Sequence, residues 1–585
     1  MSGSTHYIGE KAFPVAARAY GTSNANLLDV TDELVEVIVK FSGDIQKVAA
    51  ELEAQAEVLY QNYAIITIEK NKLPKLYSYQ EVENIELPKI VSYESTFNLV
   101  STCIKPVQDK NSYHLTGKGV IVAIIDSGID YTHKDFQNAD GSSRILYIWD
   151  QVTPGNPPAG FFGGTEYNQE QINTALNSAE PFELIPNTDP NGHGTAVAGV
   201  AAGNGRSSES DNMGAAPDSD IIAVRIGTRG FESFARSTEV MRAIKYVIDK
   251  AKLLKKPIAI NISMGTNNGS HTGTSLFESY ISDISADWKT VIVVPTGNEG
   301  SAGHHYSGKI ETGQTKDIEF FTSPGIYSFY LGIWKNFADS FKIEIILPTG
   351  VSSGVIGIEN QTKTIRAENM TISVIYGQPT HYTTNQEIFI DVRAPGVPIN
   401  AGLWKIRLIA DQIVDGNFNM WLPTLEEVTD ETFFSQASID NTQTIPSTAL
   451  KVISVAGYND RVGNVAEFSG RGNSNPALPG PDIAAPAVQI VSTKTGGGYD
   501  AFTGTSMAAP FVTGAVALMM QWGIVQQNDP YLYGERAKAF LRLGATRSKD
   551  GKYPNPSLGY GTLCLKTTMN YLVQYKWGGN LFWLQ

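Results

Sequence analysis

The feature that most constrains this chain is a series of short, continuously apolar runs that alternate with helical stretches from about residue 118 onward. The runs are residues 119–125, 220–226, 257–263 and 290–295. Runs of this kind are typical of parallel strands buried on both faces. Residues 237–254 lie between two of them and repeat apolar side chains at helical spacing. The alternation predicts an α/β fold built on a doubly wound parallel sheet.

Residues from about 305 to 440 break this alternation. Turn residues separate short β-like runs there and no long helix occurs, which predicts an inserted all-β sandwich. At residues 450–456 (LKVISVA) the buried-strand pattern resumes, so the insertion interrupts one α/β domain and does not follow it. The β-like runs are residues 317–320, 327–333, 342–347, 370–376, 387–393 and 403–410.

The N-terminal hundred residues form a separate pattern. Residues 34–41 resemble a strand, and residues 44–58 recur at helical spacing with Asp44 placed as an N-cap. Two alternating runs follow at 63–69 and 84–91, which predicts a small α+β unit. The expected organisation is an N-terminal unit at 1–95, the first part of the α/β domain at 96–304, the insertion at 305–440 and the second part at 441–585.

Composition excludes several classes of function. Lys and Arg number 45 against 59 Asp and Glu, giving a net charge of −14, and phosphate-backbone binding depends on clustered cations. Only Cys103 and Cys564 are present, which rules out a disulfide framework and leaves one long-range bridge open. The first residues contain no apolar signal segment, and no apolar run approaches the roughly 20 residues of a membrane span. We therefore expect an intracellular protein without a nucleic-acid partner or membrane span.

Three short segments carry candidate chemistry. The letters AIIDSGID place Asp126 at the carboxyl end of a buried strand, the edge at which sites form in open α/β sheets. NGHGTAVAG places His193 between glycines at the start of a helix of small residues, and FTGTSMAAP places Ser506 at the start of another. A serine needs a base to become a nucleophile, an imidazole can shuttle that proton, and a carboxylate can fix the imidazole tautomer. Each residue alone fits a cap or turn, but together they indicate nucleophilic catalysis.

In these motifs the sequence resembles the subtilisin-like serine proteases (subtilases). The resemblance implies a subtilisin-like sheet and a triad of Asp126, His193 and Ser506. The letters VIVVPTGNEG end a strand in a Gly-Asn turn, and in the family this Asn, here Asn298, donates its side-chain amide to the oxyanion. The resemblance implies no cofactor, and calcium dependence is not readable from it.

Two further segments match the family. Ser263, Met264 and Gly265 resemble the strand that binds an extended peptide by β-addition. Residues 482–486 (DIAAP) match a segment with a structural role.

The N-terminal unit resembles the subtilase prodomain, which acts as an intramolecular chaperone and leaves its C-terminus in the active site. Cleavage is then expected within residues 87–97. The prodomain without a signal segment, the run RILYIWD at 144–150 and the β insertion after Asn298 together resemble the Csp germination proteases of clostridial spores. Those proteases carry a jelly-roll insertion, can retain the cleaved prodomain non-covalently and process the zymogen of a spore-cortex hydrolase. The resemblance implies the same protein substrate and a spore-associated location.

Three alternatives stay open. The protein could be a general intracellular subtilase for protein turnover, or a signalling pseudoprotease whose site is plugged by its prodomain. The intact motifs favour activity. Carbohydrate binding by the β insertion is a third, but core packing explains its aromatic residues more simply.

The other histidines have simpler interpretations. We interpret His133, in the extension of the Asp126 motif, as structural. His304 and His305 are adjacent, so a metal site is conceivable, but no cysteine or spaced acidic partner completes it and we expect a solvated loop. Residues 138–141 (NADG) lack the remaining ligands of a calcium loop and predict a turn.

Overall fold

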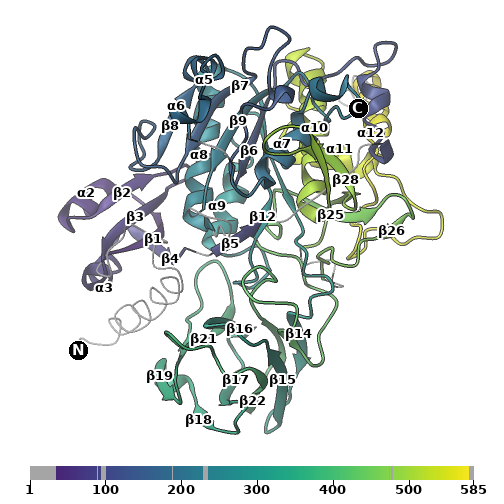
Figure 1. Ribbon diagram of the computed structural model, residues 1–585. Helices are drawn as coiled ribbons and strands as arrows, with labels where there is room; N and C mark the ends of the chain where they lie inside the picture. The colour runs from purple at the N-terminus through teal and green to yellow at the C-terminus, as the bar shows by residue number, and fades with distance from the viewer. Residues whose placement is uncertain are drawn as a thin grey trace, which may run out of the picture. The chain divides into compact units, whose positions relative to one another are not determined.

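The computed structural model describes residues 34–88, 90–93, 100–186, 189–227, 235–473, 475 and 479–578 (Figure 1). The chain divides into two compact units. The first, called the β-rich unit, comprises Met1–Ile90, Thr266–Phe277 and Glu299–Ile445. The second, called the α/β unit, comprises Val91–Gly265, Glu278–Asn298 and Pro446–Gln585.

The α/β unit contains a nine-stranded sheet in the order β26-β25-β13-β11-β6-β9-β7-β8, with β27 beside β25. All pairs between β7 and β27 are parallel, and only the edge strands β8 and β26 run antiparallel. β13 pairs with β25 with Val293 opposite Ile453, so the chain returns to the same sheet after the insertion, as predicted. The bounds are β6 Ile121–Asp126, β7 Ile145–Asp150, β8 Thr165–Asn168, β9 Asp220–Arg225, β11 Ile258–Ile262, β13 Thr290–Pro295, β25 Ile453–Asn459, β26 Asn464–Val465 and β27 Ile483–Pro486.

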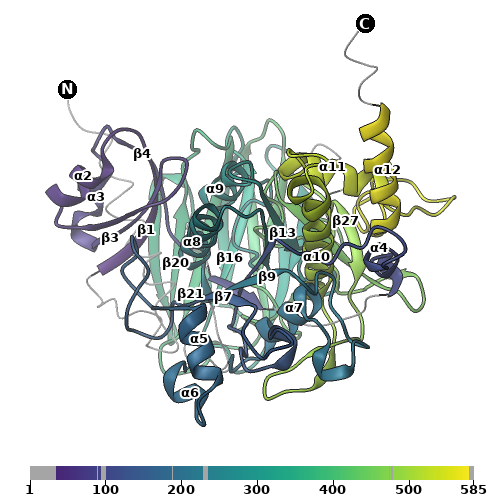
Figure 2. The same ribbon diagram turned by 90° about the horizontal axis from the view of Figure 1, so that it is seen from above.

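Helices cover both faces of this sheet, which explains why every residue of β6 is buried (Figure 2). Alternate residues such as Val122 and Val293 belong to the same core as Ala515 and Leu518 of α10. The intervening side chains point to the opposite face because successive residues of a strand alternate. The helices are α4 Lys105–Gln108, α5 Gln169–Leu176, α6 Pro181–Leu184, α7 His193–Ala202, α8 Ser237–Leu254, α9 Leu276–Ile284, α10 Ala508–Met520, α11 Gly534–Gly544 and α12 Leu565–Gly578.

Short elements complete the α/β unit. Four single-turn 3-10 helices, a π-helical turn that extends α10, a hairpin and a small three-stranded sheet lie around the main sheet. They are β5 Ile90–Tyr93, η2 Val100–Thr102, η3 Lys134–Phe136, η4 Arg206–Ser208, β10 Ala235–Arg236, β12 Met264–Gly265, β28 Ile490–Thr493, β29 Tyr499–Phe502, η6 Thr505–Met507 and the π-helical η7 Gln521–Val525.

Two features bear on the predictions from composition. Cys103 and Cys564 form a disulfide with Cα atoms 4.8 Å apart, which joins the segment before α4 to the start of α12. The segment Thr505–Val525 has the length and hydropathy of a membrane span, but 94% of its apolar 18-residue window is buried inside the protein, where it serves as a core helix.

The N-terminal part of the β-rich unit is a four-stranded sheet in the order β2-β3-β1-β4 with α2 packed on it. Asp44 caps α2 by accepting the Lys47 N–H at 3.1 Å, as expected. The prediction of a single helix over 44–58 is wrong: α2 ends at Glu51, and the following residues pair with β3 with Ala56 opposite Ile66. Residues 84–91 likewise divide between two strands. The bounds are β1 Leu34–Phe41, α2 Ile45–Glu51, β2 Gln55–Val58, β3 Tyr63–Glu69, η1 Lys70–Lys72, α3 Leu73–Leu76 and β4 Val82–Glu86.

The insertion consists of two antiparallel sheets that share one core. One sheet has the order β14-β23-β16-β21-β20-β19 and the other β18-β17-β22-β15-β24. Trp404 of β22 and Leu331 of β16, one from each sheet, both belong to this core. The bounds are β14 His305–Lys309, β15 Thr315–Thr322, β16 Ser328–Asn336, β17 Ser340–Ile346, β18 Ser352–Ile356, η5 Ile358–Asn360, β19 Thr362–Ala367, β20 Met370–Tyr376, β21 Asn385–Arg393, β22 Gly402–Gln412, β23 Asn417–Trp421 and β24 Phe433–Phe434.

Candidate active site

The structure brings the predicted aspartate and histidine into direct contact. Asp126 is the last residue of β6 and His193 is the first residue of α7. The Nδ1 atom of His193 lies 2.7 Å from Oδ1 of Asp126, and both residues are buried. Gly194 is required for this approach, because a Cβ at that position would lie 2.2 Å from the Gly128 carbonyl oxygen. The contact places the histidine hydrogen on Nδ1, the tautomer that a proton shuttle at Nε2 needs.

Ser506 lies in the 3-10 turn η6, directly before α10. Its hydroxyl lies 3.5 Å from the Ser263 carbonyl oxygen, and the Ser263 hydroxyl donates to the Ser506 carbonyl at 2.9 Å. Asn261 donates its side-chain amide to the Ser263 hydroxyl at 2.7 Å and accepts from Thr513 of α10. The end of β11 and the helix that carries Ser506 are therefore held together by side-chain hydrogen bonds.

Asn298 is oriented by the neighbour of the serine. Its side-chain carbonyl accepts the Thr505 N–H at 3.0 Å and lies 3.2 Å from the Thr505 hydroxyl. The same hydroxyl accepts the Gly297 N–H at 3.1 Å. Because a backbone N–H needs an acceptor, these contacts assign the Asn298 oxygen to the Thr505 side and its NH₂ group to the other.

The predicted substrate-binding residues Met264 and Gly265 form β12, the edge of a three-stranded sheet in the order β10-β5-β12. The middle strand, β5, lies near the C-terminal end of the N-terminal unit expected at residues 1–95. It runs antiparallel to β12, with Tyr93 opposite Met264 and Ser92 opposite Gly265. The chain itself thus occupies the position in which β-addition would seat an extended peptide.

Further residues, to which the sequence motifs assigned no role, complete the site. Ser127 donates its N–H to Asp126 at 2.7 Å, and its hydroxyl lies 2.6 Å from a second buried carboxyl group, Asp189. Thr505 and Asn261 position Asn298 and Ser263 as described above. The only signal in the sequence was position, because Ser127 and Thr505 each adjoin a predicted catalytic residue.

The prediction of a solvated loop at His304 and His305 is wrong, since both side chains are buried. His304 pairs with Glu299 at 2.6 Å, and His305 begins β14 with its ring stacked on Trp421. Burial alone would lower the pKa of His304, but the Glu299 carboxylate outweighs it and the net pKa is raised. Burial lowers the pKa of His305 to about 4. In the described part of the chain, no group of three or more His, Cys, Asp or Glu side chains is placed to hold a metal ion.

The remaining minor predictions hold. His133 is buried, with Nε2 3.0 Å from the Gly498 carbonyl and Nδ1 accepting the Asp135 N–H at 3.2 Å, as a structural histidine would be. Gly141 donates its N–H to the Asn138 carbonyl at 3.0 Å, which closes the predicted turn.

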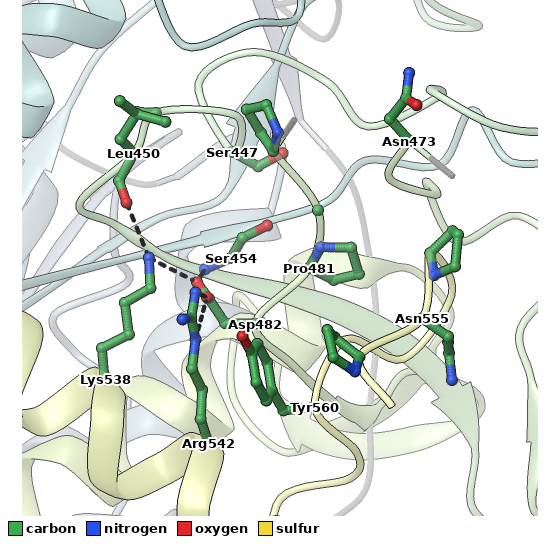
Figure 3. Close-up of a pocket in the computed structure, with 15 residues that line it drawn as sticks. Ser447, Leu450, Ser454, Asn473, Pro481, Asp482, Lys538, Arg542, Asn555 and Tyr560 are labelled. Atoms are coloured by element: carbon green, nitrogen blue, oxygen red, sulfur yellow. Dashed lines mark hydrogen bonds and ion pairs between the residues drawn. The ribbon is translucent and has the colours of Figure 1, made fainter. Parts of the chain in front are cut away.

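A pocket of about 250 Å³ lies at the amino ends of β25 and β27 (Figure 3). Because these strands run parallel to β6, this is the opposite end of the strands from the one at which Asp126 lies. Lys538 and Arg542 of α11 point toward Asp482, which also accepts the Ser454 N–H at 2.7 Å. Lys538 in addition donates to the Leu450 carbonyl at 3.0 Å. The charges of this pocket are therefore committed to holding the start of β27, which agrees with a structural role for residues 482–486.

Comparison with known proteins agrees with this geometry. Residues 117–400 and 416–561, more than half of the chain, match the Subtilase family, and residues 22–89 match the Csp protease B prodomain. The solved structure of the CspB protease of Clostridium perfringens is 39% identical with a TM-score of 0.75, covering 81% of this chain and 96% of that one.

Curated relatives are more distant. The minor extracellular protease Vpr of Bacillus subtilis is 26% identical over 76% of this chain and 51% of its own length. The PIII-type proteinase of Lactococcus lactis subsp. cremoris is 22% identical over 73% of this chain and 23% of its own length. The chain thus spans about a quarter to a half of these relatives. The match to the Subtilase family over more than half of the chain and the 39% identity to the Clostridium perfringens protease lead to one conclusion: the chain belongs to the subtilase family.

Proposed function

We propose that this protein is an active serine endopeptidase that first cleaves its own N-terminal unit and then processes one protein zymogen. The observation that carries the proposal is the buried contact of 2.7 Å between His193 and Asp126, combined with Ser506 at the start of a core helix. A serine becomes a nucleophile only with such an oriented base.

The proposed reaction is acyl transfer. The Ser506 oxygen attacks the peptide carbonyl carbon while Nε2 of His193 takes the hydroxyl proton, and Asp126 stabilises the imidazolium that forms. The side-chain NH₂ of Asn298 and the backbone N–H of Ser506 donate to the developing oxyanion. His193 then protonates the leaving amine, and water hydrolyses the acyl-enzyme by the same proton route.

The register of β5 predicts which bond is cut first. Tyr93 lies opposite Met264, and we infer that an extension of this antiparallel register by one residue would bring position 94 opposite Ser263. The Ser506 hydroxyl lies 3.5 Å from the Ser263 carbonyl, so the residue at that step is the one whose carbonyl Ser506 would attack. We therefore propose cleavage between Glu94 and Ser95, within the expected window of 87–97 and outside the described residues.

The identity of the later substrate rests on the likeness to CspB and on the matched Csp protease B prodomain. Together they support a protein zymogen of spore germination, a spore-cortex hydrolase precursor, and a location inside the cell or spore. They also support a cleaved prodomain that stays bound. General protein turnover is the second candidate, favoured only by the intact catalytic residues.

The test is the intact mass of the purified wild type beside Ser506→Ala. We expect two co-purifying wild-type fragments whose masses divide after Glu94, and one uncleaved mutant chain. A Ser506→Ala chain that still matures alone would refute the nucleophile. A split at another bond would refute the register argument and leave the nucleophile intact.

A fluorophosphonate reagent and a protein digest separate the remaining alternatives. Labelling of wild type at Ser506 with one defined cut in a candidate zymogen supports processing. Many cuts in unfolded casein support turnover. Absence of labelling after self-cleavage would support a plugged, inactive site.

A further inference from the structure

A second buried carboxyl group, which the proposed mechanism does not use, lies beside the catalytic pair. Asp189 is four residues before His193 and has no exposed surface. Its Oδ1 lies 2.6 Å from the Ser127 hydroxyl and accepts the Gly192 N–H at 3.1 Å. Its Oδ2 accepts the N–H of Thr195 at 2.8 Å and the hydroxyl of Thr195 at 2.6 Å. The Asp189 side chain thus links Ser127 to Gly192 and Thr195, which lie on either side of His193 in the sequence.

The hydroxyl of Ser127 restricts the protonation of this cluster. Its oxygen accepts the Gly194 N–H at 2.9 Å and lies 3.2 Å from Oδ1 of Asp126 and 2.6 Å from Oδ1 of Asp189. A serine hydroxyl has one hydrogen, so it cannot donate to both carboxyl groups. Were both groups ionised, one of these contacts would bring two acceptors together. A proton on Asp189 removes the conflict, because Asp189 then donates to Ser127 and Ser127 donates to Asp126.

The surroundings of Asp189 favour the neutral form. Burial raises its pKa, opposed by hydrogen bonds from Ser127 and Thr195, and the nearby charge of Asp126 raises it further. The titratable groups beside it are Asp126 on β6 and His193 on α7, while Asp130 reaches the cluster through its backbone N–H, which donates to Thr195. Asp189 therefore has an anion beside it and no cation in direct contact among the described residues.

Asp126 depends on the donors at one of its oxygens. Its Oδ1 accepts the Nδ1–H of His193 and the backbone N–H of Ser127, and the Ser127 hydroxyl oxygen lies 3.2 Å from it. Its Oδ2 is buried without a hydrogen-bond partner in the part of the chain that the structure describes. The direction of the single Ser127 hydrogen therefore affects how well the Asp126 charge is stabilised.

We propose that Asp189 is a positioning residue of the catalytic site, which acts as a neutral carboxylic acid that donates to Ser127 and so turns the Ser127 hydroxyl toward Asp126. The proposal rests on the proposed function. In this arrangement Asp126 is the one anion of the cluster. The hydrogen bonds of the Asp189 side chain hold the end of β6 at Asp126 against the start of α7. His193 is thereby kept in the orientation and tautomer that proton transfer needs.

The test compares Asp189→Asn with Asp189→Ala. An asparagine can donate N–H to Ser127 and accept from Thr195, so it imitates the neutral acid, whereas alanine does neither. We expect Asp189→Asn to keep the rate of fluorophosphonate inactivation and of casein hydrolysis within about threefold. We expect Asp189→Ala to lower kcat about 10²-fold at unchanged KM, the size of loss that follows misplacement of a catalytic group.

The pH profile distinguishes a neutral Asp189 from an ionised one. Exchange of a neutral acid for a neutral amide should leave the acid limb of the inactivation rate, which reports His193, at the same midpoint. Loss of an anion so near His193 would instead move that midpoint to lower pH. The infrared difference between wild type and Asp189→Asn should contain the C=O band of a protonated carboxyl group.

Asp339→Asn is the matched control. Asp339 is equally buried and accepts the backbone N–H groups of Val414, Asp415 and Gly416 in the β-rich unit. We expect it to lower the unfolding midpoint and leave the inactivation rate unchanged.

Several outcomes would overturn the proposal. They are an Asn variant as slow as the Ala variant, an acid limb displaced in the Asn variant, the absence of the carboxyl band, or an Ala variant as fast as wild type. If Asp189→Ala does not fold, the Asn variant and the infrared band still decide. A wild type that is not labelled at Ser506 would refute the proposed function, which is a separate result.

Discussion

The protein contains two buried pairs of histidine and carboxylate, one in each unit. In the α/β unit His193 lies 2.7 Å from Asp126, and in the β-rich unit His304 lies 2.6 Å from Glu299. By burial and distance the two pairs are almost the same. Their surroundings differ, because His304 has its second ring nitrogen 2.8 Å from the Thr432 carbonyl. A close histidine–carboxylate contact is therefore not sufficient for an active site.

The protonation of the two pairs differs for the same reason. Both ring nitrogens of His304 face oxygen atoms, and against the opposing effect of burial the Glu299 carboxylate raises the pKa of the ring, which favours the imidazolium form. A general base must instead accept a proton, which an imidazolium cannot do. The pair at Asp126 lies at the carboxyl end of a parallel sheet, where sites form, whereas the pair at Glu299 is enclosed by the chain, with Asn267 and Leu425 donating to Glu299.

The largest expected difference is in catalysis. His193→Gln should lower kcat by about 10⁶-fold, the loss recorded when the histidine of a subtilisin triad is removed, while the unfolding midpoint stays near that of wild type. His304→Gln should do the reverse and cost about 3–5 kcal/mol in the free energy of unfolding, because Glu299 is left buried without its partner. Casein hydrolysis per titrated active site and urea unfolding measure the two effects. Equal activity losses in both variants would erase the distinction.

Two adjacent residues sharpen the comparison, because the boundary between the units falls between Asn298 and Glu299. Asn298→Ala should lower kcat by about 10²–10³-fold with little change in KM, since an oxyanion donor acts mainly in the transition state. Glu299→Gln should mainly lower stability, because it removes the charge that His304 pairs with. Steady-state kinetics of both variants measures the effect on kcat and KM, and thermal unfolding measures the effect on stability. An Asn298→Ala enzyme with normal kcat would remove Asn298 from the proposed oxyanion site.

The smallest expected effects lie in the pH dependence of stability. His304 has a raised pKa when folded, so the stability it contributes is full below its unfolded pKa of 6.5 and is lost as pH rises through the folded value. His305 has its pKa lowered to about 4, so its contribution is full above 6.5 and falls by about 3 kcal/mol as pH drops toward 4.

The measurement is urea unfolding of wild type, His304→Gln and His305→Gln across this pH range. The stability difference between wild type and His304→Gln should shrink with rising pH. The corresponding difference for His305→Gln should shrink with falling pH. Parallel curves for the two variants would contradict the assigned protonation states.

Much of the fold and of the candidate site follows from local pattern. The apolar run 290–295 coincides with β13, and the helical stretch 237–254 coincides with α8. A strand buried on both faces is apolar throughout, and a helix packed on a sheet repeats apolar residues at helical spacing, so both can be recognised from sequence. The motifs around Asp126, His193 and Ser506 identified residues that the structure places at a strand end and at two helix starts. Local sequence is sufficient there because each motif combines its functional residue with the element that carries it.

What the sequence by itself determined is therefore the α/β alternation, its interruption by β strands and the residues of the catalytic motifs. Only the tertiary structure decided that residues 55–58 leave the expected helix and pair with β3, that His304 and His305 are buried, and that Asp189 reaches Ser127. Each of these outcomes depends on partners distant in the chain, such as Glu299, Trp421 or β3. Pairing energy, burial and charge compensation come from those partners, and no local pattern of residues contains them.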